Sequence, residues 1–292
     1  MTLIETVADL RAWRKTAGHV VFVPTMGALH EGHATLVREA RQLAGKDAQV
    51  AASIFVNPLQ FGPNEDFDRY PRTLEADMAM CEAAGADMIF APAVREVYHA
   101  DRSIKILETS LSNVLCGASR PGHFDGVCTV VAKLFNLVQP DEAVFGKKDY
   151  QQLAIIRRLV RDLDIPVDIH GIETVREPDG LAMSSRNRYL SSEERAEAPA
   201  LRQALLAARE AWLRGVSGTS SLLSLIHDHL SENARLGCED YIALVDQQTL
   251  QPLDIAHNQS LIALAVCFGK ARLIDNIELI KDQDEPGQHA SL

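Results

Sequence analysis

The chain has 292 residues, of which 47% are hydrophobic, enough to bury the core of one large domain or of two ordinary ones. Its formal net charge of −11 excludes a generally basic surface for binding nucleic acid or an anionic membrane. The longest strictly apolar run, residues 261–268, is far shorter than the roughly 20 residues that span a bilayer. We therefore expect no nucleic-acid partner and no membrane.

The N-terminal sequence leads directly into an amphipathic helical pattern, with no basic stretch followed by an apolar one, so no secretory signal is expected. The five cysteines are scattered and none are spaced as C-x-x-C, which argues against a disulfide framework and against a zinc site. A reducing cytoplasm is the expected location.

Short β-branched segments alternate with helical patterns through the first 175 residues. Strands are predicted over 19–25, 49–56, 86–90, 142–145 and 167–172. The helices between them are predicted over 34–44, 74–84, 127–138 and 151–163. Strands and helices that alternate with short links form a mostly parallel sheet covered by helices on both faces. The predicted class is therefore α/β, with a doubly wound parallel sheet.

The alternation stops after Asn187. A helix is predicted from about 193 to 214, broken near Pro199, and a second over 221–233. Three strands are then predicted over 241–245, 261–268 and 272–280. Helices followed by strands indicate a second, smaller α+β domain. The predicted domains are residues 1–186 and 187–292, and the acidic tail 282–292 is expected to be disordered.

The first candidate site follows the first strand of the alternating region, at the edge where α/β sheets bind ligands. Residues 23–33 read VPTMGALHEGH, and the helix that follows offers N–H groups to phosphate. His30 and His33 are three residues apart, so one helical turn would let both donate to one anion. The alternatives are a polar turn without a ligand and half of a metal site.

Two common phosphate-binding motifs are absent from this segment. Gly27 and Gly32 have the spacing of a P-loop, but His33 and Ala34 stand where that loop needs Lys and Ser or Thr. No two glycines of the chain stand two residues apart, so the G-x-G-x-x-G dinucleotide motif is also missing. The segment is therefore not a P-loop, and a Rossmann dehydrogenase loses most of its support.

Three further segments carry polar groups at strand ends or between the domains. The turn 145–152, FGKKDYQQ, combines lysine for phosphate with aspartate for ribose hydroxyls. The loop 180–187, GLAMSSRN, combines serines and arginine as an anion clamp. Asn57 and Gln60 follow a strand and suit a small hydroxylated substrate with methyl groups. The turn 145–152 could also be a solvated charged turn, and the loop 180–187 a polar linker with an N-cap serine. The segment of Arg120 and His123 could equally be a helix-entry loop.

Taken together, the motifs of these segments resemble the pantothenate synthetase family. They are PTMGALHEGH, IFVNPLQFGPNEDFDRYPRT, RPGHFDGV, FGKKDYQQL and GLAMSSRNRYLS. HEGH and MSSR also resemble the HIGH and KMSKS elements of the wider nucleotidyltransferase superfamily. The resemblance becomes looser beyond about Leu190. It implies a Rossmann-like sheet, a smaller C-terminal domain, a cytoplasmic location and a homodimer.

The resemblance also implies a reaction. The family joins pantoate to β-alanine with ATP, through a pantoyl adenylate, and releases AMP and pyrophosphate. Mg²⁺ would be bound mainly through the ATP phosphates, without a metal site on the protein. The rival activities are transfer of AMP or CMP to a phosphorylated acceptor, aminoacylation of tRNA, and binding of an adenine nucleotide without catalysis. A short acidic chain disfavours the tRNA reaction.

The resemblance assigns roles residue by residue. Catalytic roles would fall to His33, His30, Lys148 and Arg186. Gln60 and Gln152 would bind pantoate. The ATP site would comprise Met26, Gly27, Ala28, Leu29, His30, Glu31, Gly32, His33, Gly146, Lys147, Lys148, Asp149, Val175, Met183, Ser184, Ser185 and Arg186. Lys147 stands where the family more often has an acidic residue, so only this position is expected to lack a specific role.

Overall fold

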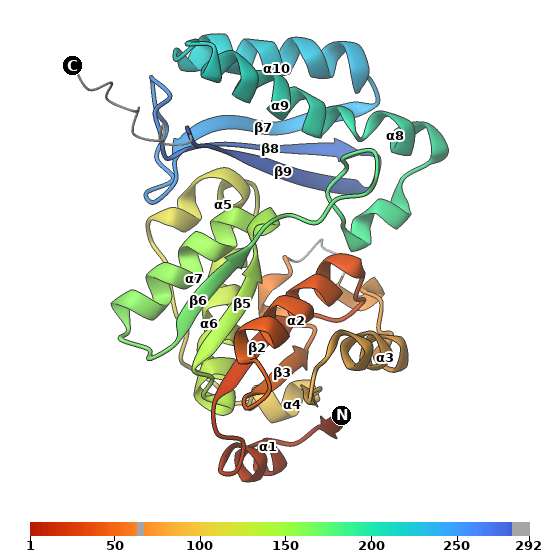
Figure 1. Cartoon of the computed structure of the whole chain (residues 1–292), viewed down its shortest axis with the longest axis vertical. Helices are drawn as coiled ribbons and strands as arrows, with labels where there is room; N and C mark the ends of the chain where they lie inside the picture. Colours follow the sequence, from red (N-terminus) through yellow and green to blue (C-terminus); the bar gives the residue numbers. More distant parts are fainter. Residues whose placement is uncertain (63–66, 282–292) are drawn as a thin grey trace, which may run out of the picture.

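The structure is a computed structural model that describes residues 1–62 and 67–281. It contains a larger unit built on a six-stranded sheet and a smaller unit built on a three-stranded sheet, one above the other in Figure 1. The strands of the larger unit are β1 (Thr2–Ile4), β2 (Val20–Thr25), β3 (Gln49–Ile54), β4 (Met88–Phe90), β5 (Glu142–Gly146) and β6 (Asp168–Ile172). Those of the smaller unit are β7 (Gly237–Asp246), β8 (Ser260–Phe268) and β9 (Ala271–Leu279).

Helices connect these strands. The larger unit contains α1 (Val7–Arg14), α2 (Glu31–Ala44), α3 (Leu74–Ala84), α4 (Val94–Val97), α5 (Leu115–Ser119), α6 (His123–Val138) and α7 (Tyr150–Asp162). The smaller unit contains α8 (Ser192–Glu197), α9 (Ala200–Leu213) and α10 (Thr219–Asn233). Short 3-10 turns are η1 (Pro58–Gln60), η2 (Phe67–Arg69), η3 (Leu111–Asn113), η4 (Lys147–Asp149) and η5 (Ser185–Tyr189).

The strand order of the larger sheet creates a ligand-binding edge. All its pairs are parallel, and the order is β1-β4-β3-β2-β5-β6. From β2 the chain proceeds outward to β3 on one side, whereas β5 lies on the other side and leads outward to β6. The carboxyl ends of β2 and β5 are therefore the switch point at which doubly wound sheets bind ligands. The histidine segment leaves β2 there, and the 147–149 turn leaves β5.

The central strand β2 is buried on both faces. Val20 and Phe22 pack into one core with α6 and α7, while Val21 and Val23 pack into another with α2 and α3. Successive side chains of a strand point to opposite faces, so an unbroken apolar run satisfies both helical layers. The predicted α/β class is confirmed.

The small sheet lies between its own helices and the larger unit. Ile262 and Leu264 of β8 pack against α9 and α10, whereas Leu261 and Ala263 join the core that surrounds α6 and α7. In Figure 1 the sheet β7–β9 accordingly lies between α9 and α10 above and the larger unit below. Strand β9 is thereby brought close to the segments that follow β5 and β6.

Most expected elements of the chain are confirmed, with two corrections near helix starts. The strand β1 precedes α1, where the N-terminus was expected to lead directly into a helix. Helices α2 and α6 begin several residues earlier than predicted, because polar and glycine residues that look like loop form their first turns. The break at Pro199 lies between α8 and α9 as expected. The predicted disorder of residues 282–292 falls outside the described residues.

Among residues 1–62 and 67–281, no helix has the length and apolar character needed to cross a bilayer.

Helix α6 packs closely against the turn η1 at Gly126. A Cβ atom at this position would lie 2.3 Å from the carbonyl oxygen of Leu59 and 2.6 Å from the amide nitrogen of Gln60. Because these are backbone atoms, Gly126→Ala must push the turn away from the helix. We expect a loss of about 1–3 kcal/mol in the free energy of unfolding, measured by urea denaturation.

Gly218→Ala is the matched control, since its Cβ atom would meet only the Ser221 hydroxyl at 3.8 Å. That change should alter stability by no more than about 0.5 kcal/mol. Unchanged or increased stability of Gly126→Ala would contradict the close packing of α6 on η1.

Candidate active site

A cavity of about 220 Å³ opens at the carboxyl ends of β2 and β5. Four separate segments supply most of its polar lining, and Thr25, Tyr70, Glu173 and Thr174 also line it. The lining residues from these segments and from Val175 are Met26, His30, Gly32, His33, Asn57, Gln60, Gly146, Lys148, Asp149, Gln152, Val175, Met183, Ser184, Ser185 and Arg186. The structure thus brings together the histidine segment, the Gln60 turn, the lysine turn and the serine-arginine loop in one place.

The two histidines form the N-terminal cap of α2. The Nδ1 atom of His30 accepts from the Gly32 amide at 3.1 Å, and the Nδ1 atom of His33 accepts from the His30 amide at 3.3 Å. An imidazole that accepts at Nδ1 and is neutral carries its proton on Nε2. Each ring therefore has an Nε2–H donor to offer to a ligand in the cavity.

Both imidazoles are neutral at neutral pH. Burial, together with smaller effects of the nearby His30 and Lys148, lowers the pKa of His33 to about 3. Burial also lowers the pKa of His30 to about 4; Lys148 and Arg188 act in the same direction, and Asp149 opposes them. The histidines therefore contribute hydrogen-bond donors to the site rather than positive charge.

The turn before α2 is held by a buried carboxylate. Asp77 of α3 is 2% exposed and accepts from the amides of Ala28 and Leu29 at 2.9 and 2.8 Å. Gly27 has a φ of 78° and its Cβ position lies 3.0 Å from Asp77, so glycine is required at this close approach.

This arrangement corrects one expectation, that the helix start leaves its amides free for phosphate. The amides of Ala28, Leu29, His30, Gly32 and His33 all have partners within the chain. Asp77 and the imidazole rings supply most of these acceptors, so these five amides are already paired within the chain.

The Gln60 side chain lies in a buried polar network. It is 7% exposed, its Oε1 accepts from Asn57 at 3.0 Å, and its Nε2 contacts the Met26 sulfur at 2.9 Å. Asn57 is fixed in turn by Tyr98, whose hydroxyl donates to Asn57 Oδ1 at 2.9 Å. The Gln60 backbone is held as well, because the ring of His123 contacts its carbonyl oxygen at 2.8 Å. Sequence reasoning noted Asn57 and His123 but did not foresee this network.

The turn after β5 separates its two lysines. Lys148 lines the cavity, and its Nζ atom lies 3.7 Å from the Asp149 carboxylate. Lys147 does not line it, because its ammonium group forms ion pairs with Glu173 and with Glu278, the latter at 2.8 Å. Gln152, one turn into α7, returns to the cavity wall.

The serine-arginine loop is closed at its base by backbone pairing. Arg176 and Ala182 form an antiparallel bridge, and the Met183 amide donates to the Val175 carbonyl at 3.0 Å. Arg195 of α8 holds the loop by an ion pair with Asp179, with 2.6 Å between the guanidinium nitrogen and the carboxylate oxygen. These contacts bring residues 183–186 over the cavity.

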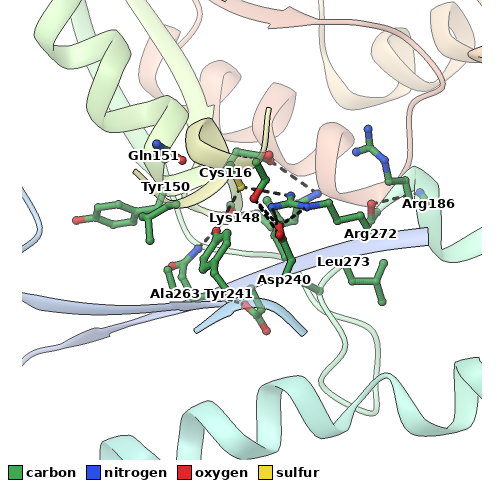
Figure 2. A pocket seen from close by; sticks show the side chains of 18 of the residues that line it. Cys116, Lys148, Tyr150, Gln151, Arg186, Asp240, Tyr241, Ala263, Arg272 and Leu273 are labelled. Carbon is green, nitrogen blue, oxygen red and sulfur yellow. Dashed lines mark hydrogen bonds and ion pairs between the residues drawn. The ribbon is translucent and has the colours of Figure 1, made fainter. Parts of the chain in front are cut away.

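A second, larger cavity of about 770 Å³ lies between the two units and adjoins the first. Lys148, Asp149, Gln152, Ser184 and Arg186 line both cavities. Figure 2 shows the side that belongs to the small sheet, where Asp240, Tyr241 and Arg272 face Cys116 and Lys148. The strand patterns predicted over residues 241–280 gave no indication that Tyr241 and Arg272 line a cavity.

The family model for pantoate-beta-alanine ligase matches residues 2–278. The chain belongs to this family. A pantothenate synthetase from Akkermansia muciniphila is 53% identical over 286 residues, covering 96% of this chain and 100% of the relative. Another from Magnetococcus marinus is 51% identical over 283 residues, covering 96% of each chain. The expected family is confirmed.

Solved structures agree with this membership of the pantoate–β-alanine ligase family. The pantothenate synthetase of Thermus thermophilus aligns with a TM-score of 0.91 at 49% identity, covering 96% of this chain and 100% of that one. The pantoate-beta-alanine ligase of Francisella tularensis was crystallised with beta-gamma ATP and beta-alanine. It aligns with a TM-score of 0.77 at 34% identity, covering 96% of this chain and 98% of that one.

The residues expected to bind ATP in this ligase fall into two groups. Twelve of them line the smaller cavity and are Met26, His30, Gly32, His33, Gly146, Lys148, Asp149, Val175, Met183, Ser184, Ser185 and Arg186. The other five line neither cavity and are Gly27, Ala28, Leu29, Glu31 and Lys147. The first three form the turn on Asp77, while Glu31 and Lys147 form ion pairs.

The neutral histidines predict how the stability of this ligase depends on pH. Both pKa values lie below the ordinary value of about 6.5, so the unfolded chain binds more protons than the folded chain between about pH 6.5 and 4. Stability is therefore lost as the pH falls through this range. Urea denaturation at several pH values should show a shallower loss in His33→Gln, by up to about 1.4 kcal/mol per pH unit. Parallel curves for the two proteins would contradict the buried neutral imidazole.

Proposed function

We propose that this protein joins pantoate to β-alanine in the paired cavities, by first forming pantoyl adenylate from ATP. The observation that carries the proposal is the convergence of four distant segments on one cavity at the switch point of the sheet. Ligand sites commonly enclose about 300–1,000 Å³. The smaller cavity alone, at about 220 Å³, is too small for ATP with pantoate, whereas the two adjoining cavities provide enough space.

The chemical difficulty is charge, because the pantoate carboxylate must approach the α-phosphorus of a triphosphate. Lys148 and Arg186 supply positive charge, and Ser184, Ser185 and the histidine Nε2–H groups supply neutral donors. Attack of the carboxylate oxygen forms the adenylate bond and expels pyrophosphate. No covalent intermediate on the protein is required, since positioning and electrostatics provide the rate enhancement.

Pantoate fits the inner part of the smaller cavity. Gln60 and Gln152 offer amide groups for its hydroxyl and carboxylate groups, while Val130, Val131 and Leu134 provide an apolar wall for its methyl groups. The amine of β-alanine would then reach the adenylate from the larger cavity and displace AMP, which completes the amide. A loop such as 180–186 can exclude water from the adenylate.

Mg²⁺ is proposed to enter with ATP, because the ion prefers phosphate oxygens and water to an all-protein cage. Among residues 1–62 and 67–281, no three His, Cys, Asp or Glu side chains are grouped so that they could hold a metal ion. When bound, the ion would neutralise phosphate charge beside Asp149 and Lys148. We further propose that the protein is cytoplasmic and forms a homodimer, as the family resemblance implies. Sedimentation velocity can test the dimer.

Pyrophosphate release separates this function from its rivals. With ATP and pantoate alone, a ligase should release about one equivalent per site and then stop, because the adenylate stays bound. Adding β-alanine should restore continuous release with formation of one amide per pyrophosphate. Continuous release without the amine would indicate a nucleotidyltransferase, and no release at all would indicate a nucleotide-binding protein without catalysis.

Lys148→Ala and His33→Ala should fold normally and lose the adenylation step. Removing one donor from developing transition-state charge costs about 10²-fold or more in rate, on the order of 3 kcal/mol. Rapid-quench measurement of the pyrophosphate burst tests this. Lys46→Ala, at an exposed lysine in the turn after α2, is the control. A burst at the native rate in either site variant would remove that residue from the mechanism.

Gln60→Ala should raise the KM for pantoate about tenfold while changing the KM for ATP much less. A hydrogen bond to a charged substrate group contributes roughly 1.5–3 kcal/mol, which corresponds to a tenfold effect or more. Steady-state kinetics with each substrate varied in turn provide the measurement. Equal effects on both substrates would place Gln60 outside the pantoate pocket.

A further inference from the structure

Both loops of the proposed nucleotide site contact one short segment of the smaller unit, residues 275–278 of β9. Asn276 is 8% exposed, and its side-chain amide donates to the carbonyl oxygens of Lys147 and Lys148, at 3.0 Å each. One buried side chain thereby fixes two successive peptide groups of the turn that presents Lys148 to the cavity.

Glu278 holds the same turn from a second point. Its carboxylate accepts from Lys147 at 2.8 Å and from the Tyr150 hydroxyl at 3.1 Å. Asn276 and Glu278 are two residues apart, so both point to the face of β9 that meets the larger unit. The turn is thus held on the two sides of Lys148, whose own side chain remains available to the cavity.

Asp275, the residue before Asn276 in β9, holds the other loop. It is 3% exposed and forms a bidentate ion pair with Arg176, whose two terminal nitrogens donate to its carboxylate oxygens at 2.7 and 2.9 Å. Arg176 also donates to the Gly180 carbonyl at 3.0 Å and pairs with Ala182. The base of the loop that carries Ser184–Arg186 is therefore fixed to the same strand.

We propose that residues 275–278 of β9 are a positioning segment that sets the distance between Lys148 and the serine-arginine loop. This inference rests on the proposed roles of Lys148 and Arg186 at the nucleotide. Adjacent residues of one strand face opposite sides, so a single rigid element can hold two loops at once. A misplacement of about 1 Å at reacting groups can cost 10²-fold in rate, which gives such an element a catalytic effect without contact with the reacting atoms.

Asn276→Asp tests the segment most sharply, because it replaces two donors by an acceptor that faces two carbonyl oxygens. We expect a native circular dichroism spectrum, a kcat lowered about 10- to 100-fold in the adenylation step, and a KM for β-alanine within about twofold of native. Asn233→Asp, at the exposed end of α10, is the control and should change neither constant.

A charge exchange distinguishes positioning from general destabilisation. Lys147→Glu and Glu278→Lys should each lower kcat, and the double variant should recover a large part of it. Native kcat in Asn276→Asp together with an inactive Lys148→Ala would overturn the positioning role and leave the nucleotide site intact. An active Lys148→Ala would instead overturn the site itself. Failure of the double variant to recover beyond the better single variant would also contradict the proposal.

A second inference concerns the cysteines of the small sheet. Cys238 of β7 and Cys267 of β8 are directly opposite partners in the antiparallel register. Cys238 is exposed, and Cys267 is half-buried and lines the larger cavity. Opposite Cα atoms in such pairs lie about 4.5–5.5 Å apart, within the range of about 4.4–6.8 Å that a disulfide requires.

The geometry points to a reversible oxidation site for low-molecular-weight disulfides of the glutathione type. The exposed Cys238 thiolate attacks the small disulfide, forming a mixed disulfide and releasing one thiol. Cys267 then attacks the Cys238 sulfur, forming the Cys238–Cys267 bond and releasing the second thiol. The protein loses two hydrogens, and one small disulfide is reduced to two thiols.

This bond would lie beside the contacts between the two units. Arg272 is the β9 partner of Cys267 and forms an ion pair with Asp240 at 2.6 Å. Asp240 also accepts from the Ser119 hydroxyl of α5 at 2.9 Å. The oxidation site therefore adjoins the junction between the small sheet and α5.

Peptide mapping under non-reducing conditions tests the pair, after incubation of the folded protein with oxidised glutathione. We expect an intramolecular Cys238–Cys267 disulfide in the native chain and in Cys116→Ser, and a stable mixed disulfide at Cys238 in Cys267→Ser. A native chain that carries only a mixed disulfide at Cys238, or that does not react at all, would overturn the proposal.

Discussion

The constraint on which the whole site depends is the meeting of two anions in a protein with a net charge of −11. Bulk electrostatics oppose this encounter, so cationic and donor groups have to be concentrated locally. The switch point between β2 and β5 provides the place, because two strand ends deliver their following segments to the same crevice. The neutral histidines add donors there without bringing buried charges that would need partners.

Much of the larger unit could be predicted from the sequence, because its strands are apolar runs and its helices follow short links. The strand β1 could not be predicted, since three residues are too few to show a recognisable period. The start of α2 was placed too late because His30 caps it, a role that Ser, Thr, Asp or Asn usually fill. Helix α3, which is followed by Gly85 at its C-terminal cap, has the predicted bounds.

The candidate site could be predicted where residues follow a strand end and not where tertiary packing decides. His33, Gln60 and Lys148 each come after a strand and reach the cavity as expected. Asp77 could not be foreseen as the anchor of the Gly27 turn, because it lies in the middle of a helix far along the chain. The role of Asn276 could not be predicted either. An asparagine within a strand pattern gives no indication that its side chain will donate to the carbonyl groups of a distant turn.

The proposed mechanism requires the α-phosphate of ATP to lie between the histidine pair of α2, the Lys148 turn and the serine-arginine loop. A crystal structure with a non-hydrolysable ATP analogue and pantoate measures this most directly. It should show oxygens of the triphosphate within hydrogen-bonding distance of a histidine Nε2, Lys148 Nζ and Arg186, with the pantoate carboxylate facing the α-phosphorus beside Gln60. A triphosphate bound away from these groups, or pantoate outside the Gln60 pocket, would contradict the account.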